Sequence, residues 1–258
     1  MLAVLLLVSA ICLVPAGGAP GPKRLRLHVM SYNIHVGIGM DKKLDLARIA
    51  EVIKRERVDL VGLQEVDRGV ERTGRVDEIK ELARLTGMDY AFAHNLDYQG
   101  GQYGVAVLSR FPILAIDHRR YANRRERERR GFIRVEVEVG GRRLNFVTTH
   151  LDYQFMDGRV FETEQLLKAL EEVRGPLLVI GDFNEEPEGG AHAMMLKAGF
   201  ADAWTQGAAA GLTFPADKPT KRIDYVFHRG LGDDVHAIAT VSDTLASDHR
   251  PLVVSLKF

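Results

Sequence analysis

The sequence contains a single cysteine, Cys12, among its 258 residues. One thiol excludes a disulfide and a cysteine-based metal site within one chain, so the packing of the core must hold the fold together. The sequence also lacks an excess of charge of either sign, because 35 basic side chains are balanced by 35 acidic ones. A dedicated nucleic-acid-binding protein usually carries a basic excess, and this composition does not provide one.

Three common catalytic motifs are missing as well. The chain contains no HExxH motif, no GxxxxGKS/T loop and no GxSxG elbow. Their absence argues against a zinc metalloprotease, a P-loop nucleotide enzyme and a serine hydrolase, in that order.

The sequence has no apolar run of the roughly 20 residues that a comfortable membrane span requires. Its longest apolar stretch, at residues 2–16, is followed by small residues up to Ala19. We interpret residues 1–22 as a secretory signal peptide or an N-terminal membrane anchor, and we expect a secreted or periplasmic protein. The basic run 23–26 follows the apolar stretch instead of preceding it, which favours the alternative of a protein anchored by residues 2–16. The third interpretation of this N-terminal segment is a misassigned start codon.

Residues 23–258 show no repeat, low-complexity linker or break in composition, and we predict that they form one domain. The pattern of apolar residues predicts strands and helices in mixed order. This mixture of hairpins and crossovers favours two packed mixed sheets covered by helices over a purely parallel sheet. Strands are predicted at 25–34, 58–66, 103–113, 131–152 (a hairpin), 176–184, 222–229, 235–242 and 251–258, and helices at 44–56, 78–87 and 162–173.

Two segments have no clear periodicity. Residues 118–134 carry eight arginines and are interpreted either as a solvated loop or as a rim that attracts an anionic substrate. Residues 199–221 are predicted to be a long loop, and long loops in compact domains are often functional. Trp204 in this loop is interpreted as a core anchor or, alternatively, as part of a lipid-facing rim.

Polar residues of a narrow chemical set follow the predicted strands. Strand ends on one side of a sheet converge in space, so residues far apart in the sequence can line one pocket. Asp182 and Asn184 lie two positions apart, which in an extended strand end directs both side chains the same way. The set comprises Asn33, His35, Glu65, His150, Asp152, Asp182, Asn184, Asp224, Asp248 and His249.

Oxygen and imidazole donors without a thiol favour a hard divalent cation. We predict Mg²⁺, with Mn²⁺ as an alternative, because Mg²⁺ completes its shell with water and substrate phosphate oxygens. Phosphoester hydrolysis also needs a water to be deprotonated and aimed. Glu65 suits metal ligation, and Asp248 is predicted to fix the imidazole of a base, His249. Asn184 and His150 suit donation to phosphoryl oxygens.

Taken together, these segments resemble those of the endonuclease/exonuclease/phosphatase superfamily, and within it the small bacterial members called metal-dependent hydrolases. The resemblance covers nearly all of residues 25–258. It implies a deoxyribonuclease-like α/β fold, a four-layer α/β sandwich of two packed mixed β-sheets flanked by helices, with the site at one open edge. The motifs occur in the family's order: "MSYNIH" (30–35), "GLQEV" (62–66), "YGVAVLSR" (103–110), "THLD" (149–152), "GDFN" (181–184), "RIDYVF" (222–227) and "SDHRPL" (247–252).

The resemblance also implies roles for individual residues. It makes Glu65 the principal metal ligand, with Asn33 in or beside its coordination shell. It makes His150 a phosphate contact, and Asn184 a residue that holds both the attacking water and the phosphate.

The base that activates the water is implied to be Asp182 or His249, and the sequence leaves this choice open. Asp248 and His249 match the acid–histidine pair that closes the family's motif series. Asp182 would orient or deprotonate the attacking water.

Three further positions are implied to contact the substrate. Arg130 resembles a substrate-side arginine of bacterial members, and Asp224 matches a position near the metal or phosphate. His35 departs from the DNA-repair members, which carry an acid at this position, and this difference weakens a close analogy to abasic-site enzymes.

We therefore predict a Mg²⁺-dependent phosphohydrolase, and specifically a phosphodiesterase that uses metal-assisted attack of water. The substrate is left open between a phospholipid head group, nucleic acid and a small phosphoester. An extracellular nuclease is the alternative enzyme, and a non-catalytic binding protein of the same fold is the alternative from another class. Association with a membrane surface and a monomeric state are further expectations.

Overall fold

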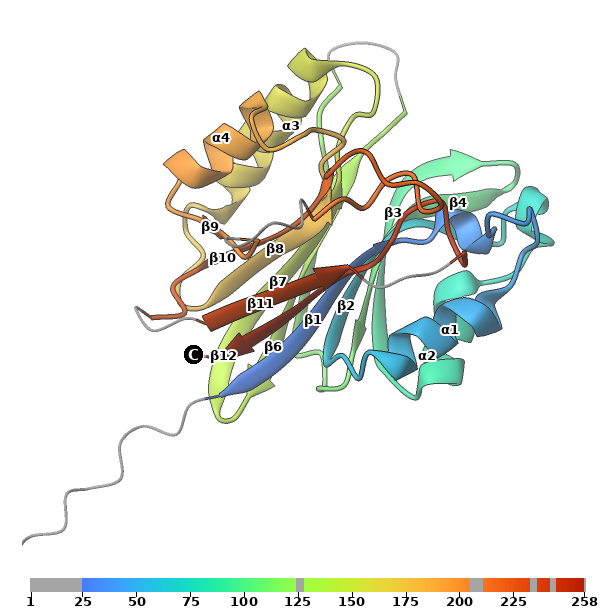
Figure 1. Cartoon of the computed structure of the whole chain (residues 1–258), viewed down its shortest axis with the longest axis horizontal. Coiled ribbons are helices and arrows are strands. Elements are labelled where there is room, and N and C mark those ends of the chain that lie inside the picture. The colour runs from blue at the N-terminus through green and yellow to red at the C-terminus, as the bar shows by residue number, and fades with distance from the viewer. Residues whose placement is uncertain (1–24, 124–127, 205–210, 233–235, 242–244, 258) are drawn as a thin grey trace, which may run out of the picture.

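Two six-stranded β-sheets pack face to face and carry helices on their outer surfaces, as Figure 1 shows. The computed structural model describes residues 25–123, 128–204, 211–232, 236–241 and 245–257. The segment interpreted as a signal peptide or anchor lies outside these residues. The first sheet has the order β11 (His236–Val241), β12 (Leu252–Lys257), β1 (Arg26–Asn33), β2 (Leu60–Arg68), β4 (Gly101–Ser109) and β3 (Asp89–Tyr98). The second has the order β5 (Ala115–Arg120), β6 (Gly131–Val139), β7 (Arg142–His150), β8 (Leu177–Asp182), β10 (Asp224–Arg229) and β9 (Ala201–Asp202).

Two α-helices cover the outer face of each sheet. One apolar core lies between the sheets, and two more lie under the helix pairs. This arrangement confirms the four-layer α/β sandwich. No helix among the described residues is long and apolar enough to cross a membrane. The first sheet carries α1 (Leu46–Arg55) and α2 (Glu78–Thr86), the second carries α3 (Met156–Leu170) and α4 (Gly190–Lys197), and short 3₁₀ helices occupy His35–Gly37 and Glu71–Thr73.

Local signals explain where the helices of the first sheet begin and end. The Asp45 side chain accepts a hydrogen bond from the backbone N–H of Arg48 at 2.9 Å and caps α1. Gly87 ends α2 in the left-handed conformation, with a φ of 71°, which glycine adopts without a steric penalty. The predicted apolar stripe of α1, including Ile49 and Ile53, is buried against the sheet.

The two sheets approach closely at Gly62 on β2. A Cβ atom at this position would lie 2.6 Å from Ile180 and 2.7 Å from Thr148, both on the opposite sheet. The next inward side chain, Gln64, crosses the same interface and donates to the Thr148 hydroxyl at 2.8 Å. A side chain larger than hydrogen at position 62 would therefore push apart the strands that carry the polar residues of the site.

The topology brings four of the predicted site residues to one edge. β1 pairs in parallel with β2, and β7 pairs in parallel with β8, so the carboxyl ends of both pairs point the same way within each sheet. A helix returns the chain between the members of each pair. The four residues at or near these carboxyl ends are Asn33, Glu65, His150 and Asp182.

Some elements differ from the sequence-based assignment, which lacks β3, β5, β9 and α4. β3 buries the small side chains of Ala91 and Ala93, and these give only a weak apolar alternation. α3 begins at Met156 instead of 162, because the Asp152 carboxylate accepts backbone N–H groups two and three residues later and turns the chain early.

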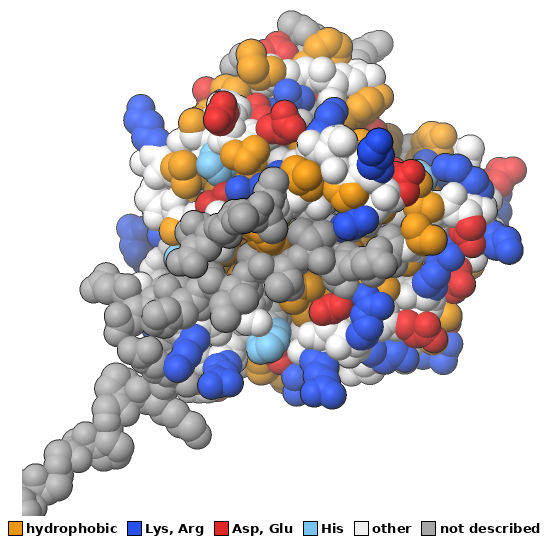
Figure 2. Space-filling model, in the orientation of Figure 1, with side chains coloured by type: hydrophobic (Ala, Val, Ile, Leu, Met, Phe, Trp, Pro, Cys, Tyr) orange, Lys and Arg blue, Asp and Glu red, His pale blue; other side chains and the backbone are white. Residues whose placement is uncertain are grey.

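The described parts of the two segments without periodicity include some regular structure. β5 takes up the start of the arginine-rich segment 118–134, of which residues 124–127 lie outside the described part. Trp204 is half-buried and packs against the core between the sheets. On the face that Figure 2 presents, Lys and Arg side chains are interspersed with Asp and Glu rather than gathered in one stripe.

Candidate active site

A cavity of about 420 Å³ opens at the edge where the parallel strands end. Its wall includes Glu65, His150, Asp182, Asn184 and His249, which come from four separate segments of the chain. Residues that the sequence separates by as many as 184 positions thus share one polar hollow, as expected from the convergence of strand ends.

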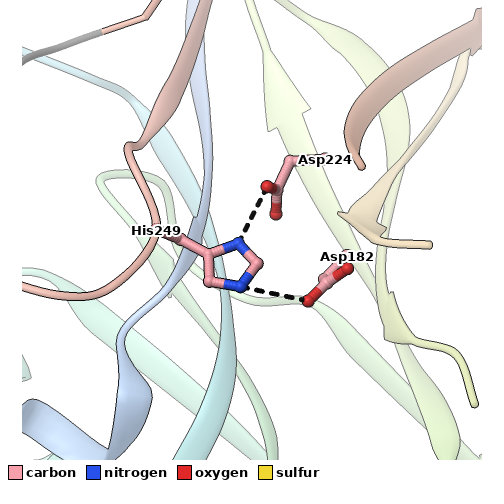
Figure 3. A group of neighbouring side chains, drawn as sticks. All are labelled: Asp182, Asp224 and His249. Atoms are coloured by element: carbon pink, nitrogen blue, oxygen red, sulfur yellow. Dashed lines mark hydrogen bonds and ion pairs between the residues drawn. The ribbon is translucent and has the colours of Figure 1, made fainter. Parts of the chain in front are cut away.

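His249 is held by Asp224 and faces Asp182 (Figure 3). Its Nδ1 lies 3.0 Å from Oδ2 of Asp224, and its Nε2 lies 3.7 Å from Oδ2 of Asp182. The prediction that Asp248 fixes this imidazole is wrong. The Asp248 carboxylate turns toward His35 instead, and its Oδ1 lies 3.8 Å from Nδ1 of His35. Asp224, which was predicted to contact substrate, is instead the acid that orients His249.

The charges of this trio support one another. Burial lowers the pKa of His249, but the carboxylates of Asp224 and Asp182 outweigh that effect and raise it. Burial raises the pKa of Asp182, and the nearby Asp224 carboxylate adds to the rise. The geometry therefore favours an imidazolium at His249 next to a carboxyl group at Asp182 that binds a proton more readily than an exposed one.

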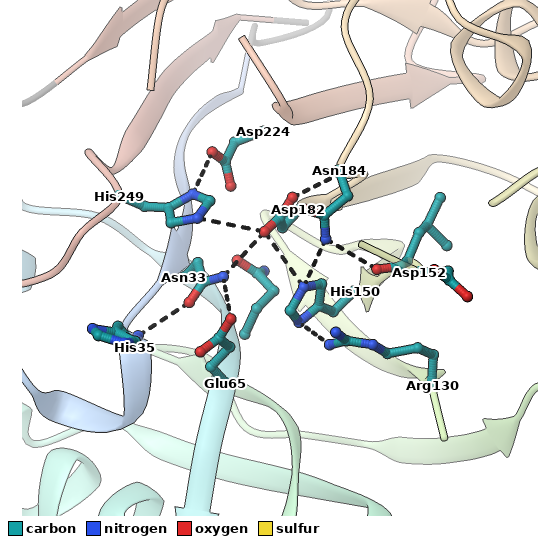
Figure 4. A network of polar contacts seen from close by, with 12 residues as sticks. Asn33, His35, Glu65, Arg130, His150, Asp152, Asp182, Asn184, Asp224 and His249 are labelled. Carbon is teal, nitrogen blue, oxygen red and sulfur yellow. Dashed lines mark hydrogen bonds and ion pairs between the residues drawn. The ribbon is translucent and has the colours of Figure 1, made fainter. Parts of the chain in front are cut away.

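Asp182 is the point on which the other side chains converge (Figure 4). Its Oδ2 lies 3.1 Å from the Asn33 amide nitrogen and 3.4 Å from Nε2 of His150. Its Oδ1 accepts the backbone N–H of Asn184 at 2.8 Å. Both oxygens of this buried carboxylate are thus oriented by the protein.

The prediction that Asp182 and Asn184 face one way by strand periodicity is wrong in its reason, although both line the cavity. β8 ends at Asp182, and Asn184 adopts a left-handed φ of 51°, which asparagine tolerates better than most residues. Its amide nitrogen donates to the carbonyl of Leu151 at 3.0 Å and lies 3.0 Å from Nε2 of His150. A tight turn, rather than an extended strand, brings the two side chains together.

Arg130 holds His150 and is itself only 3% exposed. A terminal nitrogen of its guanidinium lies 2.5 Å from Nδ1 of His150. Because arginine can only donate, Nδ1 accepts from Arg130, while Nε2 lies 3.4 Å from Oδ2 of Asp182 and 3.0 Å from the amide nitrogen of Asn184. Burial, with the charges of Arg130 and His249, lowers the pKa of His150 well below its usual value, so the ring is neutral. Arg130 lines the cavity and contacts His150, and its contact with substrate stays a prediction.

Glu65 reaches the cavity through a break in β2. The pairing of β2 with β4 shifts between Leu63 and Val66, and Glu65 has a left-handed φ of 56°. Such a bulge redirects one side chain out of the sheet. The Asn33 amide donates to Oε1 of Glu65 at 3.0 Å, so the carboxylate is held at the cavity wall.

The surroundings of Glu65 fit a hard divalent cation. Among the described contacts, a hydrogen bond reaches Oε1 of Glu65 and none is recorded at Oε2, and Mg²⁺ commonly uses one or two carboxylates with water and phosphate oxygens. Asn33 lies beside this site as a donor, because its oxygen already accepts the backbone N–H of His35 at 3.0 Å. The close group Asp182, Asp224 and His249 fits less well, since the Nδ1 of its imidazole is engaged by Asp224.

Several cavity residues were not singled out as site candidates. They share no motif with the strand-end residues, and only proximity in the fold identifies them. Asp152, in contrast, is placed at the turn before α3 and does not line this cavity. The additional lining residues are Arg72, Leu96, Tyr98, Tyr103, Glu128, Tyr153 and Phe214.

Similarity to known proteins agrees with this architecture. The chain is 27% identical over 238 residues to YbhP of Escherichia coli K12, which covers 87% of this chain and 93% of that protein. The structure of an endonuclease/exonuclease/phosphatase from Beutenbergia cavernae superimposes with a TM-score of 0.74 at 24% identity, covering 91% of this chain and 72% of that one. The mannosyl-6-phosphatase Bt3783 of Bacteroides thetaiotaomicron superimposes with a TM-score of 0.71 at 19% identity, covering 90% and 100%.

At these identities the structural matches show a shared fold. The match to a family is more specific, because the sequence model of the Endonuclease/Exonuclease/phosphatase family fits residues 30–249. That range includes every site residue described above, from Asn33 to His249. The chain therefore belongs to the Endonuclease/Exonuclease/phosphatase family, whose members hydrolyse phosphoester bonds.

Proposed function

We propose that the protein is a Mg²⁺-dependent phosphodiesterase in which water attacks the phosphorus atom. The observation that carries this proposal is the convergence of Asn33, His150 and His249 on one oxygen of Asp182, at 3.1, 3.4 and 3.7 Å. This arrangement combines a proton acceptor with neutral and cationic donors at the wall of one cavity. Those are the groups that hydrolysis of a phosphoester requires.

In this proposal Asp182 takes the proton of the attacking water. Donors surround its carboxylate and fix it, and burial raises its pKa, which improves a base. His249 is less suited to the role of base, because the two nearby carboxylates favour its protonated form. Its imidazolium instead stabilises negative charge that develops on the phosphoryl group.

The non-bridging phosphoryl oxygens are held by neutral donors. Nε2 of His150 faces the site because Arg130 occupies Nδ1, and the Asn184 amide nitrogen lies beside it as a second polar group. Fixed donors of this kind typically contribute about 3–4 kcal/mol each when they face the charge of the transition state. A divalent cation on Glu65 would neutralise phosphate charge and polarise the phosphoryl group.

A diester is favoured over a monoester by the space around the site. A second cavity, of about 290 Å³, shares Tyr153, Asn184, Phe214 and His249 with the larger one. The proposed phosphate-binding residues therefore stand between two hollows. A diester carries a group on each side of its phosphorus and would use both hollows, whereas a monoester would use one.

Hydrolysis of bis(p-nitrophenyl) phosphate, with and without EDTA, tests the proposal. We expect turnover that EDTA abolishes and that Mg²⁺ restores, with Mn²⁺ as a second activating ion. E65Q should raise the Mg²⁺ concentration needed for half-maximal turnover by about tenfold or more, since it removes the proposed carboxylate ligand. Full activity in EDTA, or an unchanged Mg²⁺ requirement in E65Q, would contradict the metal assignment.

An extracellular nuclease is the second candidate. The eight arginines of 118–134 favour it, because a nuclease commonly lines its groove with basic side chains that follow several phosphates. Parallel assays with plasmid DNA, sphingomyelin and inositol phosphates would separate these substrates. Retention of binding without any turnover would support the non-catalytic alternative.

We also propose that the protein is exported. The proposal rests on the apolar stretch 2–16 and the small residues that follow it. N-terminal sequencing of the protein from the periplasm and the growth medium should find a chain that starts after residue 16. Recovery of the uncleaved chain in the membrane fraction would instead support an anchor.

A further inference from the structure

One wall of the larger cavity is built from residues that belong to none of the strand-end motifs. We call it the Arg72–Glu128 wall, and it consists of Arg72, Tyr98, Tyr103 and Glu128. These side chains come from the segment after β2, from β3 and β4, and from the segment before β6. They lie in the same hollow as the proposed phosphate site, so a group attached to that phosphate can reach them.

Arg72 is a rigid donor whose charge is already balanced. Its Nε and one terminal nitrogen donate to the two carboxylate oxygens of the buried Asp67 at 2.8 and 2.9 Å. Its guanidinium carbon lies 4.7 Å from the ring centre of Tyr98 and 5.3 Å from that of Tyr103. A side chain held by a bidentate ion pair and two rings loses little freedom on binding a ligand. Because Asp67 compensates the charge, Arg72 offers hydrogen bonds more than net attraction for an anion.

Glu128 adds a carboxylate to the same wall. It lies 3.2 Å from the guanidinium of Arg130, and its side chain is 30% exposed. A carboxylate accepts strong hydrogen bonds from hydroxyl groups, and its ion pair with Arg130 balances its charge as Asp67 balances that of Arg72. The wall therefore combines an acceptor for hydroxyls with no net positive charge that would attract additional anions.

Aromatic rings complete the surface. Tyr98 is 40% exposed and Tyr153, which lines the same cavity, is 57% exposed. Their flat faces can pack against the C–H groups of a hydroxylated ring or short chain, while the neighbouring Arg72 and Glu128 reach its hydroxyls. Apolar faces beside paired donors and acceptors suit a ligand that is itself amphipathic and uncharged.

We infer that the Arg72–Glu128 wall binds a neutral, polyhydroxylated group, such as a sugar, a cyclitol or glycerol, that is esterified to the scissile phosphate. This inference rests on the proposed phosphodiesterase activity and specifies its substrate class. It also implies that nucleic acid is disfavoured, because the ion-paired side chains of the wall offer no net positive charge to the phosphates that flank the scissile one.

Paired p-nitrophenyl phosphodiesters test the inference in the full-length protein with Mg²⁺. One carries glycerol, one carries propanol of similar length without the extra hydroxyls, and one carries a thymidine dinucleotide. We expect kcat/KM for the glycerol ester to exceed that for the propyl ester by about tenfold or more, the scale of a charge-assisted hydrogen bond. The dinucleotide ester should be the poorest of the three.

E128Q should lower the glycerol-to-propyl ratio of kcat/KM about tenfold and should improve the dinucleotide ester relative to the propyl ester. The ratio is the readout, because an indirect effect through Arg130 would change all esters together. E136Q is the matched control, since Glu136 pairs with Arg143 on the exposed surface and should leave the ratio unchanged. Y98A, at a side chain with substantial exposure, provides a second test if E128Q does not fold, and it should also lower the ratio.

The outcomes separate this inference from the proposed function. If the wild type hydrolyses none of the three esters, the phosphodiesterase proposal itself is overturned. Hydrolysis of all three esters with equal kcat/KM, or a ratio that neither E128Q nor Y98A changes, would overturn the role of the wall alone. A preference of the wild type for the dinucleotide ester would replace the polyol by nucleic acid.

Discussion

Among the described residues, two largely buried histidine–aspartate pairs have the same nitrogen–oxygen distance. His249 lies 3.0 Å from Asp224, and His192 lies 3.0 Å from Asp202. The second pair is embedded in a structural network, because Asp202 also accepts from Arg222 and from the backbone N–H of Trp204. In the His249–Asp224 pair, the aspartate has no comparable set of additional donors. Among the described residues, Oδ1 of Asp224 is buried and has no hydrogen-bond partner.

The surroundings of the two rings differ in the same way. His192 packs against Tyr225 and Phe227, with ring centres 5.2 and 5.5 Å apart. His249 lines the cavity and presents its second nitrogen to another carboxylate, Asp182. The comparison indicates two requirements for a catalytic histidine–aspartate pair. The second nitrogen of the histidine must face a cavity, and the aspartate must not already be paired with another cation such as Arg222.

The sharpest test of this contrast removes each histidine. H249A and D182A should each lower the turnover of bis(p-nitrophenyl) phosphate by at least about a hundredfold, the scale of a lost acid–base group. H192A should retain turnover but lose about 2–4 kcal/mol of stability, because it empties a packed aromatic site. Urea denaturation and steady-state assays on the three variants measure both quantities. Comparable turnover losses in H192A and H249A would remove the distinction.

A milder test changes the acid of each pair. D224N should lower turnover by about ten- to a hundredfold, because the carboxamide keeps the contact with His249 but no longer favours its imidazolium. D202N should leave turnover within about twofold and weaken the fold, since Arg222 and His192 lose their shared partner. Wild-type turnover in D224N would show that the orientation of His249 matters less than its presence.

Arg130 and Arg222 are both buried, and they extend the comparison. R130K should lower turnover about tenfold, because lysine does not reproduce the fixed guanidinium that orients the ring of His150. R222K should affect stability and not turnover. A loss of turnover in R222K that matches R130K, measured at equal folded fractions, would contradict the assignment of Arg130 as the residue that positions His150.

The smallest expected effect concerns pH. Burial lowers the pKa of His150 in the folded protein, so the unfolded chain takes up this proton first as the pH falls. The stability contribution of neutral His150 is therefore present above the unfolded pKa of about 6.5 and is lost below it. In EDTA, H150Q should reduce the fall in stability between pH 7 and pH 5 by the equivalent of about one proton. An unchanged slope in denaturant titrations would mean that His150 takes up its proton at the same pH in the folded protein as in the unfolded chain.

The order and type of most elements could be read from the sequence. The stripe on α1, the hairpin of β6 and β7 and the polar ends of the central strands are local patterns, and local periodicity reports which face of an element is buried. The same patterns identified Glu65, His150, Asp182 and Asn184, all of which line the cavity. Elements with small inward residues, such as β3, gave no comparable signal.

The partners of these residues were decided only by the tertiary structure. Asp248 is adjacent to His249 in the sequence, yet Asp224, which is 25 positions away, holds the imidazole. The bulge at Glu65 and the fixing of His150 by Arg130 likewise depend on strand register and on the packing of distant segments.

The sequence by itself determined which side chains stand at the strand ends and what chemistry they offer, because these depend on composition and local periodicity. The tertiary structure decided which of them meet and which neighbour contacts each ring nitrogen of the histidines. It also decided which other side chains complete the cavity. The physical reason is that burial, charge pairing and hydrogen bonding act between neighbours in space, and the register of two packed sheets sets those neighbours.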